Sequence, residues 1–173
     1  MLSCVTIANL LLAAAIPAAP PASEVMAAAE AQATAQHKNI FLIFHASWCT
    51  YCRQLDTFLA APENRGVVDK YFVVVHLTIQ EYGAKASLNH PGGIEVRDAV
   101  GGKNTALPFF AFLDSRGTLI VNTINSRGVN IGYPDAPEEI DWFLVMLKKA
   151  VPAMTHEEAA TLETWLRSNG KKG

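Results

Sequence analysis

Two cysteines separated by two residues are the part of this sequence best suited to chemistry. Cys49 and Cys52 stand in the stretch HASWCTYCRQ, directly after the apolar run 39–44. A C-x-x-C pair can be a redox-active disulfide, half of a zinc site, a haem attachment site or a chance pairing. The residues around the pair, and the histidines elsewhere in the chain, separate these alternatives.

The haem and zinc alternatives lack residues that they require. Covalent haem attachment needs a histidine directly after the second cysteine, where this chain has Arg53. A structural zinc site needs four ligands, but the sequence has no second C-x-x-C and its 5 histidines show no paired spacing. We therefore expect neither a metal nor a cofactor, while a C-x-x-C without chemistry stays open.

The predicted position of the cysteines favours redox chemistry. The run 39–44 is typical of a buried strand, and apolar residues at helical spacing predict a helix over 49–61. Cys49 would then lie at the first turn of that helix, where free N–H groups and the helix dipole favour a thiolate. Cys52, one turn behind and more buried, would be placed to attack a mixed disulfide on Cys49.

The rest of the chain predicts the elements that must hold this pair. Capping-box patterns begin two C-terminal helices, one at Asp135 with Glu138 and one at Thr155 with Glu158. Further helices are expected over 23–37 with Ser23 as N-cap, 63–70 and 94–100, and further strands over 71–79, 108–113 and 118–124. Helical connections imply parallel early strands, and the turn 114–117 implies a late antiparallel hairpin. The fold class is α/β, a mixed sheet of about four strands with helices on both faces.

Composition and the N-terminal segment indicate one globular domain that is exported. The chain has 173 residues, half of them hydrophobic, with a net charge of −2 and no basic cluster of the kind that binds nucleic acid. The apolar run 5–19, followed by Pro20 and Pro21, predicts a signal peptide over 1–22 and a domain over 23–173. Because this run is short for a membrane-spanning helix, we expect export, to the periplasm, without stable membrane insertion. Removal of Cys4 with the signal would leave an even pair of cysteines.

Two stretches of the sequence resemble the thioredoxin superfamily. They are FHASWCTYC at 44–52 and ALPFFAFLDSRGTLIV at 106–121, with a helix and a valine-rich strand between them. The chain looks most similar to exported bacterial members with a W-C-x-x-C site, over roughly 39–124. The resemblance implies a thioredoxin-like fold and a thiol–disulfide oxidoreductase that acts on protein cysteines and depends on a recycling partner.

The resemblance also implies roles for the residues at the pair. Cys49 would be the exposed nucleophile and Cys52 the resolving cysteine, with Trp48 shielding both. The intervening residues, Thr50 and Tyr51, would tune the reduction potential, and Tyr51 could also contact substrate. Whether the protein oxidises, reduces or isomerises disulfides stays open.

Residues distant from the pair in sequence are implicated in the same way. Pro108 would form a cis peptide bond facing the disulfide, and Leu107 would offer backbone groups to an extended substrate peptide. Two positions depart from thioredoxins proper, which carry a buried acid where this chain has Ile43 and a lysine where it has His76. We expect His76, or else His45, to accept the proton of Cys52, because histidine titrates near neutrality.

Two other classes of function remain. The first is a non-catalytic binding module with a thioredoxin-like fold, in which Cys49 and Cys52 form a static disulfide. The second is a thiol peroxidase or a glutathione-linked enzyme. Peroxidase chemistry needs an arginine and a hydroxyl group around the cysteine, and only Arg53 supports it.

Overall fold

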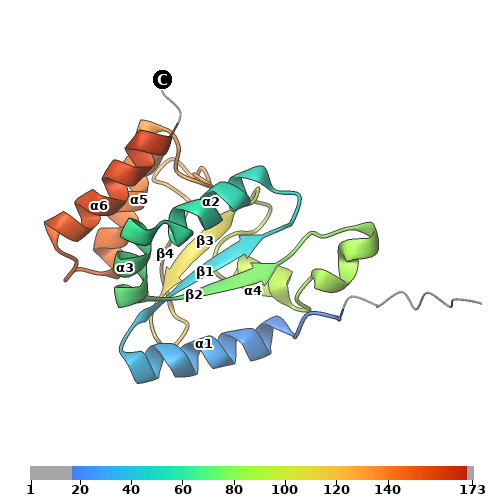
Figure 1. Ribbon diagram of the computed structural model, residues 1–173. Coiled ribbons are helices and arrows are strands. Elements are labelled where there is room, and N and C mark those ends of the chain that lie inside the picture. Colours follow the sequence, from blue (N-terminus) through green and yellow to red (C-terminus); the bar gives the residue numbers. More distant parts are fainter. Residues whose placement is uncertain (1–16, 171–173) are drawn as a thin grey trace, which may run out of the picture.

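Four strands form one mixed sheet, in the order β2-β1-β3-β4 (Figure 1). The structure, a computed structural model, describes residues 17–170. The strands are β1 (Asn39–His45), β2 (Phe72–Thr78), β3 (Phe109–Leu113) and β4 (Leu119–Asn122). β1 pairs in parallel with β2 and antiparallel with β3, and β3 forms an antiparallel hairpin with β4. The predicted mixed sheet of four strands is confirmed.

Helices cover both faces of this sheet (Figure 1). One face carries α1 (Ala22–Gln36) and α4 (Gly93–Ala99). The other carries α2 (Thr50–Ala60), α3 (Pro62–Tyr71), α5 (Pro137–Ala150) and α6 (His156–Asn169). A short 3₁₀ helix, η1 (Gly83–Leu88), lies in the connection from β2 to α4.

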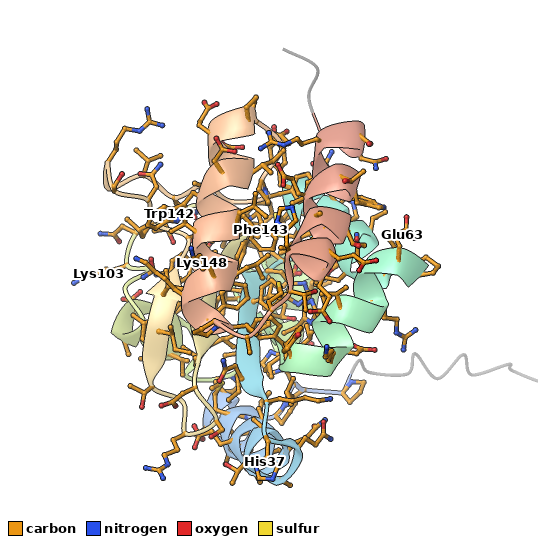
Figure 2. The ribbon with its side chains drawn as sticks, turned by 90° about the vertical axis from the view of Figure 1, so that its left-hand side faces the viewer. His37, Glu63, Lys103, Trp142, Phe143 and Lys148 are labelled. Atoms are coloured by element: carbon orange, nitrogen blue, oxygen red, sulfur yellow. A yellow bond between two sulfur atoms is a disulfide. The ribbon has the colours of Figure 1, made fainter. Side chains whose placement is uncertain are left out.

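The core differs between the two faces. Aromatic rings fill the face under α2 and α5, where Phe41, Phe72, Phe110, Phe112 and Phe143 are almost fully buried. The opposite face is filled mainly by aliphatic side chains and by the alanines of α1, with the rings of Phe44 and Phe109 as its aromatic part. Figure 2 looks onto α5 and α6 and places α1, with His37 at its end, at the bottom. The central strand β1 is buried on both faces, which explains why its sequence is continuously apolar.

Two predicted helix caps are wrong, and proline explains both. α1 begins at Ala22 after Pro21 and has no side-chain cap, so Ser23 is not its N-cap. In α5, Pro137 is the first helical residue, a position that suits its fixed φ and missing N–H. The N-cap therefore moves to Ala136, and Glu139 rather than Glu138 accepts its backbone N–H at 3.1 Å.

The cap of α6 is confirmed. The hydroxyl of Thr155 accepts the backbone N–H of Glu158 at 3.2 Å, and the Glu158 carboxylate accepts the N–H of Thr155 at 2.9 Å.

The predicted signal peptide, 1–22, lies outside the described residues except for its last part, 17–22. Residues 1–16, including Cys4, are not described, so the signal and the domain boundaries stay predictions. Among the helices within 17–170, none combines the length and the apolar character needed to cross a membrane.

Candidate active site

Cys49 and Cys52 form a disulfide where β1 turns into α2. The Cα atoms are 5.3 Å apart and the sulfur atoms are bonded. Cys49 is the N-cap of α2, and its Sγ accepts the backbone N–H of Cys52 at 3.1 Å. The sulfur of Cys49 therefore lies at the positive end of the helix dipole, where a thiolate would be stabilised once the disulfide is reduced.

The expectation of an exposed Cys49 is wrong for this oxidised form. Only 4% of Cys49 and 2% of Cys52 are exposed. Ala46 and Leu107 pack against the two cysteines and exclude solvent from them. Reactivity in this state would therefore require a partner to displace or pass the Leu107 side chain.

The loop before β3 lies beside the disulfide. The peptide bond between Leu107 and Pro108 is cis, as expected. The side chain of Asn130 donates to the carbonyls of Ala106 at 2.9 Å and Pro108 at 3.3 Å, which fixes the loop on both sides of Leu107. The loop thus brings Leu107 against the pair, although the contact of substrate with its backbone stays a prediction.

The aromatic residues near the pair are partly open to solvent. Trp48 is 51% exposed and its indole N–H donates to the carbonyl of Gln80 at 2.8 Å. Tyr51 is 41% exposed, on the first turn of α2. Thr50 is the first residue of that helix, and its hydroxyl accepts from Arg53 at 3.1 Å. The roles of these residues in shielding the pair and tuning its potential stay predictions.

Histidines meet an aspartate between the sheet and α2. His76 lies opposite Ile43 in the register of β1 and β2, and its Nε2 is 3.1 Å from Oδ1 of Asp56 on α2. The rings of His76 and His45 are 5.0 Å apart, and Nε2 of His45 is 3.0 Å from the hydroxyl of Thr78. His76 therefore faces α2, the helix that begins at the disulfide, and its role as the proton acceptor of Cys52 stays a prediction.

Burial and hydrogen bonding shift the pKa values in this group. Burial, followed by the neighbouring His76, lowers the pKa of His45 and favours its neutral form. The hydrogen bond from His76 is the main cause that lowers the pKa of Asp56. Sequence reasoning missed Asp56, although its position four residues after Cys52 places both on neighbouring turns of one helix face.

A second carboxylate holds the loop that leads into Cys49, and it was also missed. Glu81 is 4% exposed, and its carboxylate accepts both the backbone N–H and the hydroxyl of Ser47, the latter at 3.0 Å. Lys85 donates to the same hydroxyl at 2.9 Å, and Arg53 donates to the Ser47 carbonyl at 3.0 Å. Since β1 and β2 are parallel, their carboxyl ends share one sheet edge, and that rule could have pointed to the residues just after β2.

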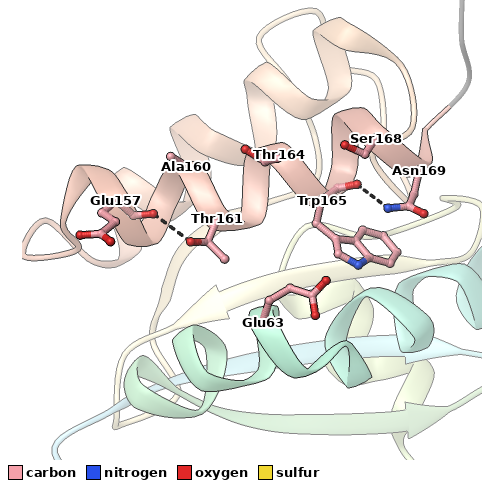
Figure 3. Close-up of a pocket in the computed structure, with 8 residues that line it drawn as sticks. All are labelled: Glu63, Glu157, Ala160, Thr161, Thr164, Trp165, Ser168 and Asn169. Carbon is pink, nitrogen blue, oxygen red and sulfur yellow. Dashed lines mark hydrogen bonds between the residues drawn. The ribbon is translucent and has the colours of Figure 1, made fainter.

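Two surface grooves differ in their relation to this site. One, of about 500 Å³, is lined in part by His45, Asp56 and His76. A larger groove, of about 670 Å³, lies between α3 and α6, and Glu63 lies beneath Trp165 in it (Figure 3). None of the residues that line this groove borders the disulfide. Within 17–170, no group of three or more histidine, cysteine or acidic side chains is arranged to hold a metal ion.

Comparisons with known proteins agree with this geometry. A family model described as thioredoxin-like matches residues 22–115, more than half of the chain. The structure is similar to a disulphide isomerase from Xylella fastidiosa Temecula1, at 18% identity and a TM-score of 0.51, over 95% of this chain and 98% of that one. It is also similar to a DsbH oxidoreductase, at 20% identity and a TM-score of 0.52, over 86% of this chain and 96% of that one. No curated protein matches the sequence. The two solved structures support the fold alone, and on the family match the chain belongs to the thioredoxin-like family.

Proposed function

We propose that this protein is an exported thiol–disulfide oxidoreductase that acts on cysteines of other proteins. The observation that carries the proposal is the placement of Cys49 Sγ at the N-terminus of α2, where it accepts a hydrogen bond from the N–H of Cys52. A cis-proline loop packed beside the pair adds support. The two structural neighbours, a disulphide isomerase and an oxidoreductase, carry out the same class of chemistry by name.

The reaction would proceed through a mixed disulfide. In the reduced protein, the Cys49 thiolate attacks a substrate disulfide, forms a bond to one substrate sulfur and releases the other as a thiolate. The Cys52 thiolate then attacks Cys49 Sγ, which releases the second substrate thiol and forms the Cys49–Cys52 disulfide. Two electrons pass to the substrate, and the reverse sequence oxidises a substrate dithiol instead.

Recycling would require a second dithiol or disulfide protein. The described form is oxidised, so a reductase cycle needs a partner that returns two electrons to the pair. The proposed periplasmic location rests on the apolar segment within 1–22 alone.

The proton of Cys52 would pass to the group formed by His76, Asp56 and His45. A desolvated thiol holds its proton tightly, and Cys52 is almost fully buried. Asp56 follows Cys52 by one helical turn and contacts His76 directly, so proton acceptors lie on the same side of the sheet as the resolving cysteine. A neutral imidazole can take up the proton directly or through one water.

A static disulfide in a binding module is the second candidate. The burial of both sulfurs favours it, because a structural disulfide needs no access for a partner thiol.

Redox equilibration with glutathione separates the two candidates. The pair should exchange with a mixture of reduced and oxidised glutathione within minutes, and its reduction potential should lie within the range that this couple can set. Samples are quenched and alkylated with a thiol reagent, and intact mass spectrometry then gives the fraction of the protein in which the Cys49–Cys52 pair is reduced. A disulfide that does not exchange in the folded protein would contradict the proposed oxidoreductase and favour a static disulfide.

A further inference from the structure

The segment 80–89 clamps the loop that leads into the disulfide. Glu81 accepts the backbone N–H and hydroxyl of Ser47, and the carbonyl of Gln80 accepts the indole N–H of Trp48. Ser47 and Trp48 are the two residues directly before Cys49. With the hydrogen bond from Lys85 to the Ser47 hydroxyl, four hydrogen bonds join this short segment to the residues at the entrance to α2.

The clamp is itself held in place. The Asn89 side chain accepts the backbone N–H of Glu81 at 2.8 Å and donates to its carbonyl at 3.0 Å. Gln80 adopts a left-handed conformation with φ of 60°, which is unfavourable for a residue other than glycine and persists only where the surroundings impose it. The segment therefore presents Glu81 and Gln80 to the loop in one defined arrangement.

The carboxylate of Glu81 is buried, so its hydrogen-bond partners show which part of the structure it holds. A carboxylate removed from water is unfavourable unless hydrogen bonds compensate it. The nearby cations do not bond to it directly, since Lys85 donates to the hydroxyl of Ser47 and Arg53 donates to the carbonyl of that residue. The hydrogen bonds of Glu81 are instead directed at the loop two residues before Cys49.

We propose that Glu81 is a positioning residue that keeps Cys49 at the N-cap of α2, with its Sγ directed at the N–H of Cys52. In the reduced protein the same placement stabilises the Cys49 thiolate through the helix dipole and that hydrogen bond. The negative charge of Glu81 acts in the opposite direction, because a nearby anion disfavours a thiolate. The inference rests on the proposed role of Cys49 as the attacking thiol.

Substitutions at Glu81 separate anchoring from charge. Glu81→Ala removes both, whereas Glu81→Gln keeps an oxygen that can accept the Ser47 N–H and removes the charge. His45, Arg53, Lys85 and His90, the other titratable or charged groups around this loop, remain in both variants. Glu95→Ala is the matched control, since it removes an exposed carboxylate from α4 on the same side of the molecule.

The measurement is the alkylation rate of Cys49 against pH in the reduced full chain, with the product mapped by mass spectrometry. Glu81→Ala should raise the midpoint of this profile by at least about half a pKa unit. Below the midpoint, this shift makes alkylation about threefold slower, because less of Cys49 is thiolate. Glu81→Gln should not raise the midpoint, and Glu95→Ala should match the unsubstituted protein. An unchanged or lowered midpoint in Glu81→Ala, or an equal rise in Glu81→Gln, would overturn the positioning role.

Two further controls keep the test decisive. If thermal unfolding shows that Glu81→Ala does not fold, Asn89→Ala takes its place. Asn89→Ala should also raise the midpoint of Cys49 alkylation, because Asn89 holds the backbone of Glu81. No rise in that variant would overturn the proposal. Alkylation needs no disulfide partner, so the two proposals can fail separately. If the alkylation midpoints follow the predicted order but the pair does not exchange with glutathione, the proposed function would be contradicted. The positioning role of Glu81 would stand.

Discussion

Along one face of β1 and β2, the side chains change from phenylalanine to histidine within a few residues. At one end of this face lie Phe41 and Phe72, with ring centroids 5.9 Å apart and both almost fully buried. At the other end lie His45 and His76, with rings 5.0 Å apart and the side chain of His76 35% exposed. The first pair belongs to the aromatic core, and the second lies beneath the helix that begins at the disulfide.

We expect this difference to separate stability from the proposed proton transfer within one sheet face. Aromatic rings gain free energy from burial and close packing, without a change of charge near neutral pH. Histidines paired with an aspartate contribute less to packing, but they can exchange protons near neutrality. We therefore expect substitutions at the aromatic end to change the free energy of unfolding and substitutions at the histidine end to change reaction rates.

The largest expected effect is on stability, from Phe41→Ala. Phe41 packs against the rings of Phe72, Phe110 and Phe112, so its truncation should lower the free energy of unfolding by about 3–5 kcal/mol. Urea unfolding measures the loss, with Phe41→Leu as a milder control. A loss below about 1 kcal/mol, or altered Cys49 alkylation in the folded variant, would break the proposed separation.

A smaller effect, on rate rather than stability, is expected from His76→Ala. If His76 helps to accept the proton of Cys52, the resolving step should slow about tenfold or more near pH 7, while Cys49 alkylation stays the same. Stopped-flow kinetics with a chromogenic disulfide reagent resolve the two steps. His156→Ala, at the exposed start of α6, is the control. Equal resolving rates in His76→Ala and the control across pH 6 to 8 would leave His76 as a structural residue.

The smallest expected effect is on stability and concerns a carboxylate outside the proposed redox site. Hydrogen bonds from Lys70 at 2.6 Å and Tyr71 at 2.7 Å lower the pKa of Glu158 from 4.5 to about 2. Because the folded pKa is the lower one, this contribution is present above about pH 4.5 and is lost as the pH falls toward 2. It should be small, since Lys70 is more than half exposed and solvent screens the pair.

Glu158→Gln tests this contribution. The variant should be less stable than the unsubstituted protein at neutral pH, and the difference in urea midpoint should shrink below about pH 4.5. Glu157→Gln, an exposed neighbour in the same helical turn, should show no such convergence. A difference that stays constant down to pH 2 would argue against the lowered pKa.

The sequence predicted the fold well because its signals were local and repeated. The apolar run of β1, the valine-rich β2 and the turn before β4 each indicate one element, and the structure contains all three. Errors arose where one proline moved a helix start, as at Pro21 and Pro137.

The site was predicted only in part, because its missing residues depend on tertiary contacts. The cysteine pair and the cis bond at Pro108 follow from motifs of a known family. Asp56 and Glu81 belong to no motif and act through partners 20 and 34 positions away in the chain. The burial of Cys49 was missed for the same reason, since Leu107 reaches it from the loop before β3.

The central claim, that Cys49 attacks and Cys52 resolves, is tested most directly with two matched variants. Reduced Cys52→Ala and Cys49→Ala are each mixed with excess oxidised glutathione at pH 7, and intact mass is followed over time. The account predicts that Cys52→Ala forms a stable mixed disulfide at least about tenfold faster than Cys49→Ala, because only Cys49 is the N-cap of α2. Equal rates in the two variants would contradict it.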